Sequence, residues 1–381
     1  MTGDRQPAAL LFANTDWYLY NFRLPLAQAV RAAGYRVHLV SPPGPYAARL
    51  AAMEGFEWHE FDFARRGINP FGEAATVARL FALYRRIRPT LCHHFTIKCV
   101  LYGSFAARLV GAARTINAIT GLGHVFVSAS YRIGLLRRPI LWLYRFCLSG
   151  TDVIFQNDDD REAFARAGVL KGARTHLIRG SGVDTERFCP DPRRRFDRTP
   201  LSILFASRLL WEKGLAELIE ATRILWERRV AAVVRIAGDP DPGNPSAVPH
   251  ATLDQWRELP NVEFLGHRAD IDRLLAQADI VVLPSYREGT PRILLEAAAA
   301  GVPLVATDVP GCREVVRAGE NGILVRAGDA IALADALERL ALDPVGRERM
   351  SVRSREIACG EFGEDRVLAA TLAIYRSKGG E

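Results

Sequence analysis

The sequence feature with the most chemical content is the stretch 284–296, PSYREGTPRILLE, which follows the apolar run 280–283. Gly289 gives its polar turn backbone freedom. Thr290 is a residue type that caps helices, and Pro291 suits a first helical position. The positive end of a helix attracts anions. The spacing therefore predicts a strand, a turn and a helix start that could bind a phosphate group.

Two carboxylates accompany this helix start. Glu288 lies in the turn just before it, where a carboxylate suits sugar hydroxyls, and Glu296 follows eight residues later, where it suits a ribose diol. We place Glu296 about two turns into the helix. The alternative interpretation is a capped surface helix with two solvated glutamates.

Two cations follow another predicted strand, within 205–214 (FASRLLWEKG). Arg208 and Lys213 are five residues apart and precede the next helix, so they could hold a diphosphate, with Arg208 offering forked donors. An exposed basic turn would have the same pattern. Gly266 and His267 also follow a strand, and a glycine there permits close backbone approach to a ligand. An ordinary turn explains that pair equally well.

Polar groups also follow predicted strands in the first half of the chain. The candidates are Tyr20, Asn21, His94, Lys98 and His124. The dinucleotide fingerprint GxGxxG is absent after the first strand, which argues against a dinucleotide there. Because metal-ligand spacings are also absent, we predict neither a metal nor another cofactor.

These residues need strands and helices to position them, and the first half alternates the two. The predicted strands are 8–13, 35–40, 56–61, 90–94, 114–118 and 153–156, and the predicted helices are 21–33, 72–87, 97–109, 131–148 and 158–167. Such alternation is typical of βαβ units and a parallel sheet.

The alternation of strands and helices begins again after 190–200, a stretch rich in proline and charged residues that we interpret as a linker. Further strands are predicted at 201–206, 231–237, 262–265, 280–283, 303–306 and 323–325, with helices at 213–227, 251–258, 269–276, 291–300, 312–317, 329–341, 344–358 and 362–377. The predicted architecture is α/β, with two doubly wound, Rossmann-like domains facing a central cleft. Ligands of such sheets bind at the carboxyl ends of strands.

The charge is uneven. The net charge is +7, but residues 1–190 carry +10 and residues 191–381 carry −3. Between Glu73 and Asp152 there is no acidic residue, while 11 lysines and arginines occur. This excess predicts an anionic partner for the first half: nucleic acid, a lipid surface or a phosphorylated substrate. No nucleic-acid motif accompanies it.

The segment 131–148, YRIGLLRRPILWLYRFCL, mixes arginines with aromatic residues. It could lie on an anionic membrane surface, or it could be a core helix with a solvated basic face. No apolar run reaches the roughly 20 residues of a spanning helix, and the N-terminus does not have the pattern of a secretory signal. The six cysteines form no CxxC pair, so we expect free buried thiols in a reducing compartment.

Taken together, these motifs resemble glycosyltransferase family 4, the retaining nucleotide-sugar enzymes with the GT-B fold. The resemblance is strongest over 201–316, through SRLLWEKG, FLGHRADI, ADIVVLPSYREGTPRILLEA and AGVPLVATDVPGCREVV. The first half resembles a branch that extends saccharides on polyprenyl-diphosphate carriers, through NTDWYLYNFRLPLA, HHFTIKCVLYGS and INAITGLGHVF. That branch includes N-acetylgalactosaminyltransferases of N-linked glycan, O-antigen and capsule assembly.

The resemblance implies roles for the candidates. Arg208 and Lys213 would hold the donor diphosphate, Glu296 its ribose, and Glu288 would sit beside the donor sugar. The backbone of Gly289 and Thr290 would contact the sugar or its phosphate, and the turn at Gly266 and His267 would cradle the base. His124 would contact the donor sugar. Tyr20, Asn21, His94 and Lys98 would belong to the acceptor side.

The implied function is metal-independent transfer of an N-acetylhexosamine, such as N-acetylgalactosamine, from a UDP-sugar to a polyprenyl-diphosphate-linked saccharide at the inner face of the plasma membrane. The implied domains are 1–190 for the acceptor, 191–200 as linker and 201–358 for the donor, with a helix in 359–381 packing back on the first domain. The alternatives are a GT-B epimerase or hydrolase, another acceptor, or an assembly protein without catalysis.

Overall fold

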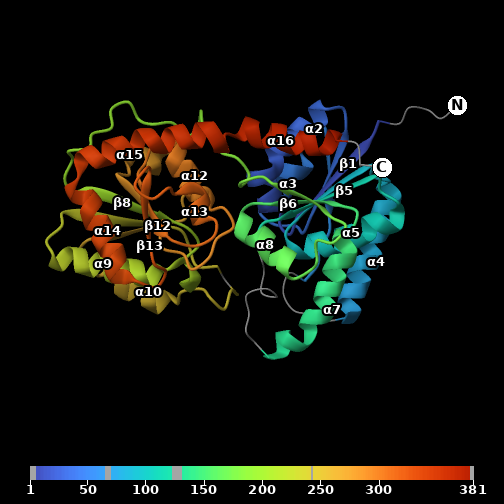
Figure 1. Ribbon diagram of the computed structural model, residues 1–381, viewed down its shortest axis with the longest axis horizontal. Coiled ribbons are helices and arrows are strands. Elements are labelled where there is room, and N and C mark those ends of the chain that lie inside the picture. The colour runs from blue at the N-terminus through green and yellow to red at the C-terminus, as the bar shows by residue number, and fades with distance from the viewer. Residues whose placement is uncertain (1–5, 65–69, 122–130, 242, 378–381) are drawn as a thin grey trace. The chain divides into compact units, whose positions relative to one another are not determined.

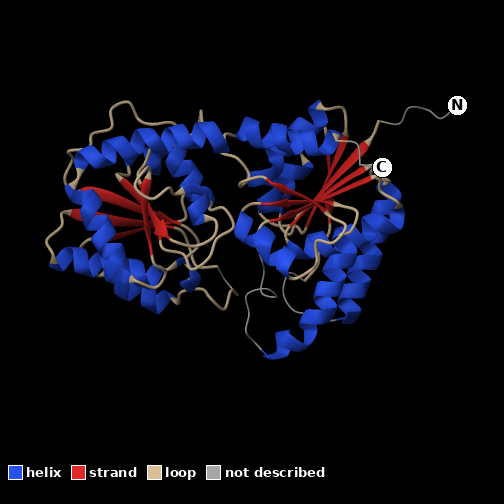
Figure 2. Ribbon diagram, in the orientation of Figure 1, coloured by secondary structure: helices blue, strands red, loops and turns tan. Residues whose placement is uncertain are grey.

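The computed structural model describes residues 6–64, 70–121, 131–241 and 243–377. The chain forms two compact units, 1–181 with 367–381, and 182–366. In each unit a parallel sheet lies between layers of helices (Figures 1 and 2). None of the described helices is both long enough and apolar enough to span a membrane.

The first unit contains a seven-stranded parallel sheet in the order β3-β2-β1-β4-β5-β6-β7. Its strands are β1 (Ala8–Phe12), β2 (Arg36–Ser41), β3 (Phe56–Glu60), β4 (Leu91–Phe95), β5 (Arg114–Ile119), β6 (Asp152–Phe155) and β7 (Arg174–Leu177). The central strands β1 and β4 are buried at every position, as expected for parallel strands covered on both faces. The polar edge strand β7 was not predicted, because RTHL has no apolar run.

Helices cover both faces of this sheet. They are α1 (Asp16–Tyr18), α2 (Leu24–Ala32), α3 (Ala47–Ala51), α4 (Pro70–Ile87), α5 (Ile97–Val110), α7 (Tyr131–Leu148), α8 (Asp158–Arg166) and α16 (Glu364–Arg376), with a π-helical turn, η1 (Leu19–Arg23), between α1 and α2. The sequence predicts one helix over 21–33, but helical structure begins at Asp16 behind the cap Thr15. Pro25 has no N–H for the regular i→i−4 bond, which accounts for the irregular turn before it.

The second unit contains a six-stranded parallel sheet in the order β10-β9-β8-β11-β12-β13. Its strands are β8 (Leu201–Ala206), β9 (Ala232–Ala237), β10 (Val262–Gly266), β11 (Ile280–Leu283), β12 (Leu304–Thr307) and β13 (Gly322–Val325). Its helical segments are η2 (Trp211–Lys213), α9 (Leu215–Glu227), α10 (His250–Arg257), α11 (Ile271–Gln277), α12 (Arg292–Ala299), α13 (Cys312–Val315), α14 (Ala330–Leu342), α15 (Pro344–Ile357) and η3 (Ala358–Phe362). The predicted alternation of strands and helices is present in both halves.

The stretch interpreted as a linker belongs to the second unit, which begins at residue 182 and extends to 366. Arg194 donates to the Leu275 carbonyl at 3.0 Å, and Arg198 pairs with Asp279 at 2.8 Å. The interpretation of 191–200 as the linker between the two domains is therefore wrong, because these residues belong to the second unit. Its composition is linker-like, but its arginines find acceptors far away in the chain.

All six cysteines are unpaired, as predicted. Cys92, Cys99, Cys147 and Cys312 are buried, whereas Cys189 and Cys359 are exposed. The expectation that every thiol is buried is wrong for the last two.

Candidate active site

The main candidate site lies where the strand order of the second sheet reverses. β8 and β11 are neighbours there, although 280–283 follows 201–206 only after two further strands. Connections leave such a pair in opposite directions, so the loops after the two strands diverge and leave room for a ligand. These loops carry the two strongest sequence motifs, 207–214 and 284–291. The topology therefore brings both motifs to one edge of one sheet.

A sheltered ion pair joins the two loops. The Lys213 Nζ donates to Oε1 of Glu288 at 2.6 Å, and the Ser285 hydroxyl donates to the same oxygen at 2.7 Å. The Lys213 and Glu288 side chains are only 15% and 12% exposed. Removing one partner of a sheltered pair leaves the other charge uncompensated, which costs far more than a surface pair is worth. Glu288 therefore holds Lys213 in a fixed position.

Two glycines let the backbone segments around this pair meet. A Cβ on Gly214 would lie 2.0 Å from the Pro284 carbonyl oxygen, and one on Gly311 would lie 1.9 Å from the Gly289 oxygen. Both glycines have positive φ, 72° and 82°, where L side chains are strained. No substitution is accommodated there without moving backbone. The two motifs are thus parts of one interlocked structure, which explains why their combination is more informative than either alone.

Arg208 has a different environment from Lys213. Its guanidinium donates to Oδ2 of Asp241 at 2.7 Å, and the Asn244 amide donates to the same oxygen at 3.1 Å. The Arg208 side chain is 61% exposed. Asp241, which the sequence analysis did not identify, lies in the loop after β9, and its position near a strand end was the only available signal. Because an exposed ion pair contributes little free energy, an incoming diphosphate could compete with Asp241 for Arg208.

We predict opposite outcomes for substitutions in this pair. Arg208→Ala removes a donor to the diphosphate and should lower kcat/KM for the donor by about 100-fold. Asp241→Asn frees the guanidinium and should leave KM for the donor equal or lower. Steady-state kinetics with varied nucleotide sugar measure both. A wild-type kcat/KM in Arg208→Ala would contradict the assignment of Arg208 to the donor.

Glu296 lies inside α12 and is 8% exposed. The Arg292 Nε donates to its Oε1 at 2.6 Å. Burial raises the pKa of the Glu296 carboxyl, and the nearby charge of Arg292 opposes that rise. The helix begins at Arg292 with Pro291 as its N-cap, so the prediction of a Thr290 cap is wrong and Glu296 is one turn into the helix, not two. The extended ψ of Pro291, 120°, places it just outside the helix.

The glycine turn after β10 is also present. Gly266 ends the strand with φ of 64°, and its carbonyl accepts a hydrogen bond from the Gly238 N–H at 2.8 Å. His267 is exposed next to it. At the ends of the neighbouring strands β9 and β10, the turn therefore presents the exposed His267 imidazole and glycine backbone that no side chain covers. A role in holding a base stays a prediction.

The first unit has a cavity of about 290 Å³ at the carboxyl ends of β1, β4 and β5. It is lined by Asn14, Phe63, Thr96, Ile97, Lys98, Thr120 and Gly121. The Lys98 Nζ donates to the Ala64 carbonyl at 2.7 Å and to Oε1 of Glu73 at 2.8 Å. Lys98 thus brings a positive charge to the cavity. Glu73, which holds this charge in place, is the last acidic residue before the acid-free tract 74–151. Of the predicted acceptor residues, Lys98 is the one that lines this described cavity.

His94 does not meet the prediction of an acceptor contact. Its side chain is fully buried, with Nδ1 2.9 Å from the Asn117 side-chain oxygen and Nε2 3.1 Å from the Tyr84 hydroxyl. A Cβ on Gly103 would lie 2.4 Å from the ring. Burial lowers the pKa of His94 to about 4, so the ring is neutral at pH 7. The expectation that His94 touches the acceptor is wrong, because packing encloses it.

Tyr20 and Asn21 lie in η1, in the region after β1. The Tyr20 ring packs on Tyr46 with 4.8 Å between centroids, and the Arg49 guanidinium lies over both rings. The Asn21 amide donates to the Trp17 carbonyl at 2.9 Å. Neither residue lines the described cavity. His124, the predicted sugar contact, lies outside the described residues.

Comparisons with known proteins match both halves. Residues 200–343 match the family model described as glycosyl transferases group 1, and residues 9–158 match the model described as glycosyl transferase 4-like.

Two curated relatives match over nearly the whole chain. The N,N'-diacetylbacillosaminyl-diphospho-undecaprenol alpha-1,3-N-acetylgalactosaminyltransferase of Campylobacter jejuni is 26% identical, over 94% of this chain and 95% of the relative. The capsular polysaccharide biosynthesis glycosyltransferase CapM of Staphylococcus aureus is 23% identical, over 91% of each chain.

A solved structure shares the fold. The Anabaena protein Alr3699/HepE, in complex with UDP and glucose, superposes with a TM-score of 0.78 and 21% identity, covering 98% of this chain and 100% of that one. The two parallel-sheet units therefore have the GT-B fold that the sequence predicts.

Proposed function

This chain belongs to the glycosyltransferases with group 1 and 4-like domains, and from that premise we propose that it transfers an N-acetylhexosamine from a UDP-sugar to a polyprenyl-diphosphate-linked saccharide. The name of the Campylobacter relative specifies N-acetylgalactosamine and an undecaprenyl-diphosphate acceptor. The observation that carries the proposal is the sheltered Lys213–Glu288 pair, which lies beyond β8 and β11, where the strand order of the second sheet reverses. It presents a fixed cation where such sheets bind phosphates.

The second unit would bind the donor. Lys213 and Arg208 would meet the diphosphate, whose negative charge grows as the bond to the sugar breaks. Preorganised cations stabilise such charge without reorganising during the reaction. Glu296 would accept hydrogen bonds from the ribose hydroxyls. The backbone at Gly289 and Thr290 and the carboxylate of Glu288 would lie beside the sugar.

We infer that transfer proceeds with retention, by attack from the face that the leaving group vacates. The bond from the sugar C1 to the phosphate oxygen breaks, and a bond from C1 to the acceptor hydroxyl oxygen forms. The hydroxyl proton passes to the departing phosphate oxygen, and UDP leaves. In this route Glu288 does not need to act as a nucleophile, which fits its engagement by Lys213 and Ser285.

The first unit would bind the acceptor. Lys98 would attract the acceptor's diphosphate to the cavity, and the acid-free tract would raise the local concentration of an anionic carrier. The cavity of about 290 Å³ has room for part of a saccharide or a phosphate group, not for a polyprenyl chain. The lipid would therefore lie outside it.

The test is a screen of nucleotide sugars against a synthetic polyprenyl-diphosphate glycan. We expect one UDP-N-acetylhexosamine to give a product extended by one sugar, with an α linkage by NMR. The same donors are incubated without acceptor, because rapid turnover there would identify an epimerase or hydrolase instead. An inverted linkage would overturn the retaining route and leave the transferase standing.

We predict that chelation leaves transfer intact. The charge of the diphosphate is met by Arg208 and Lys213 in this proposal, so excess EDTA should change the initial rate by less than about twofold. Initial rates with EDTA and with added Mg²⁺ measure this. A rate that collapses in EDTA and returns with Mg²⁺ would show that the two cations are insufficient.

We also propose that α7 contacts an anionic membrane surface. Trp142 is 67% exposed, and its ring stacks on that of Phe146 with 5.9 Å between the ring centroids. Arg138 and Arg145 are exposed on the same helix. Interfacial tryptophan and arginine beside each other favour binding to anionic lipid headgroups. Localisation at the inner face of the plasma membrane follows from this proposal.

We predict that Arg138→Glu with Arg145→Glu weakens binding to phosphatidylglycerol vesicles. Each basic residue contributes about 1 kcal/mol near an anionic surface, so two reversals should lower the partition coefficient by at least about tenfold. Vesicle co-sedimentation measures it. Arg166→Glu on α8, an exposed arginine of the same unit, is the matched control. Equal binding by both variants would place the membrane contact elsewhere.

A further inference from the structure

Three potential metal ligands gather on the first sheet, outside the sites described above. His38 lies on β2, and Glu57 and His59 lie on the edge strand β3. His38 and Glu57 are register partners across these strands, and His59 follows Glu57 by two residues. Because side chains alternate between faces along a strand, all three point to the same face of the sheet.

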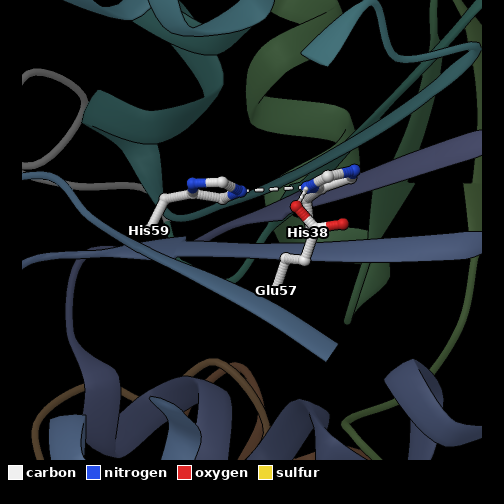
Figure 3. Close-up of side chains that lie close together, drawn as sticks. All are labelled: His38, Glu57 and His59. Atoms are coloured by element: carbon white, nitrogen blue, oxygen red, sulfur yellow. Dashed lines mark hydrogen bonds and ion pairs between the residues drawn. The ribbon is translucent and has the colours of Figure 1, made fainter. Parts of the chain in front are cut away.

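The three side chains converge. The His38 Nδ1 and the His59 Nε2 are 2.9 Å apart, and a Glu57 carboxylate oxygen is 3.4 Å from the same His38 nitrogen. The three ligand atoms all lie within 4.8 Å of one another. Figure 3 shows the two rings facing each other through these nitrogens, with the Glu57 carboxylate beside His38. Two imidazole nitrogens and one carboxylate oxygen are a frequent zinc ligand set.

We propose that His38, Glu57 and His59 bind one divalent transition-metal ion, with zinc as the best match. Where the protein supplies three ligands, a water completes the tetrahedral geometry of zinc, and zinc–ligand bonds of about 2.0 to 2.2 Å need only small side-chain adjustments from these separations. The ion would replace the hydrogen bond between the two imidazole nitrogens. Nitrogen-rich ligand sets disfavour magnesium and calcium, which prefer oxygen.

The packing of His38 fixes which of its ring nitrogens faces the other two ligands. Its side chain is 2% exposed, and its Nε2 has no hydrogen-bond partner among the described residues. The described polar partners of the ring, Glu57 and His59, are therefore on its Nδ1 side. The Glu57 side chain is 51% exposed, so an ion has a path from solvent to the buried imidazole.

Two arginines limit the affinity. The Arg36 Nε is 3.8 Å from the other Glu57 oxygen, and the charge of Arg86 on α4 acts on both imidazoles. Arg36 is half exposed, so water and salt screen it. The ion would join the edge strand β3 to β2. Since none of the three ligands lines the described cavity, its role would be to stabilise the first unit, not to take part in sugar transfer.

The experiment uses the full chain without an affinity tag, stripped with EDTA and dialysed. Isothermal titration with ZnCl₂ should show one ion per wild-type chain, and CoCl₂ should give the strong visible bands of four-coordinate cobalt. Losing an outer-shell partner alone costs 10- to 100-fold in metal affinity, so Glu57→Gln and His59→Gln should each weaken zinc binding by at least about tenfold. His250→Gln removes an exposed histidine of the second unit and should bind as wild type.

Circular dichroism of each variant checks folding, and Glu57→Gln, at a half-exposed position, keeps the test valid if His59→Gln misfolds. Zinc should raise the melting temperature of wild type and not of Glu57→Gln. Failure of wild type to bind one equivalent, or equal binding by wild type and Glu57→Gln, would overturn the site. Sugar transfer by these variants should match wild type, so this result is independent of the proposed function.

Discussion

Replacing Lys213 by alanine should lower kcat by about 10³-fold while the protein stays folded. A single preorganised donor to developing negative charge is worth about 10²- to 10³-fold in kcat. Here the loss is increased because Glu288 stays in place, sheltered and now unpaired, and it repels the leaving diphosphate. Single-turnover measurements with saturating donor report the chemical step directly.

The cause can be separated from simple loss of a cation. In the double variant Lys213→Ala with Glu288→Gln, the unpaired negative charge is gone, so KM for the donor should be lower than in Lys213→Ala alone. Arg228→Ala removes a cation of the same unit that pairs with Asp335 and Glu338 on its surface, and should behave as wild type. Wild-type kcat in Lys213→Ala would contradict the proposed role of the pair.

Replacing Glu296 by glutamine should lower kcat/KM for the donor by about 100-fold. Glutamine keeps the shape of the buried side chain but exchanges a strong acceptor for a weaker one, and hydrogen bonds to charged groups are worth about 1.5 to 3 kcal/mol. A donor whose ribose lacks the 2′ hydroxyl provides the diagnostic. Wild type should use it poorly, and Glu296→Gln should discriminate much less between the two donors.

The pH profile gives a second test of Glu296. Burial raises the pKa of its carboxyl, so on acidification this group takes up a proton at a higher pH than an exposed glutamate does. Donor kcat/KM in wild type should fall as pH drops through that raised value and be constant above it. Glu296→Gln should lack this limb. Unchanged ribose discrimination together with an unchanged acid limb would remove Glu296 from the donor site.

The sequence was sufficient for the architecture because local patterns determine it. Runs of apolar residues such as 280–283, separated by helical periods, specify a parallel α/β fold with neighbouring elements in order. The predictions of secondary structure and domain boundaries were wrong where the local composition is misleading. The polar strand β7 has no apolar run, and 191–200 resembles a linker although Arg194 and Arg198 bind acceptors about 80 residues away.

The sequence was sufficient to predict which loops carry the candidate site. Arg208, Lys213 and Glu288 each follow a strand, and parallel strands end at one edge of a sheet. Their pairing was not predictable. Nothing local indicates that Lys213 meets Glu288, 75 residues away, while Arg208 meets Asp241. The partners depend on which strands are neighbours and on two glycines, Gly214 and Gly311, that allow backbone contact.

By itself, then, the sequence determined two doubly wound domains, the loops that carry chemistry and the basic character of the first half, because each depends on residue type and near-neighbour spacing. The tertiary structure decided which side chains are buried and which residues contact one another. It enclosed His94 behind Tyr84 and Asn117, and it brought His38 beside Glu57 and His59 through strand register. Such contacts depend on packing between residues far apart in the chain, which no local pattern encodes.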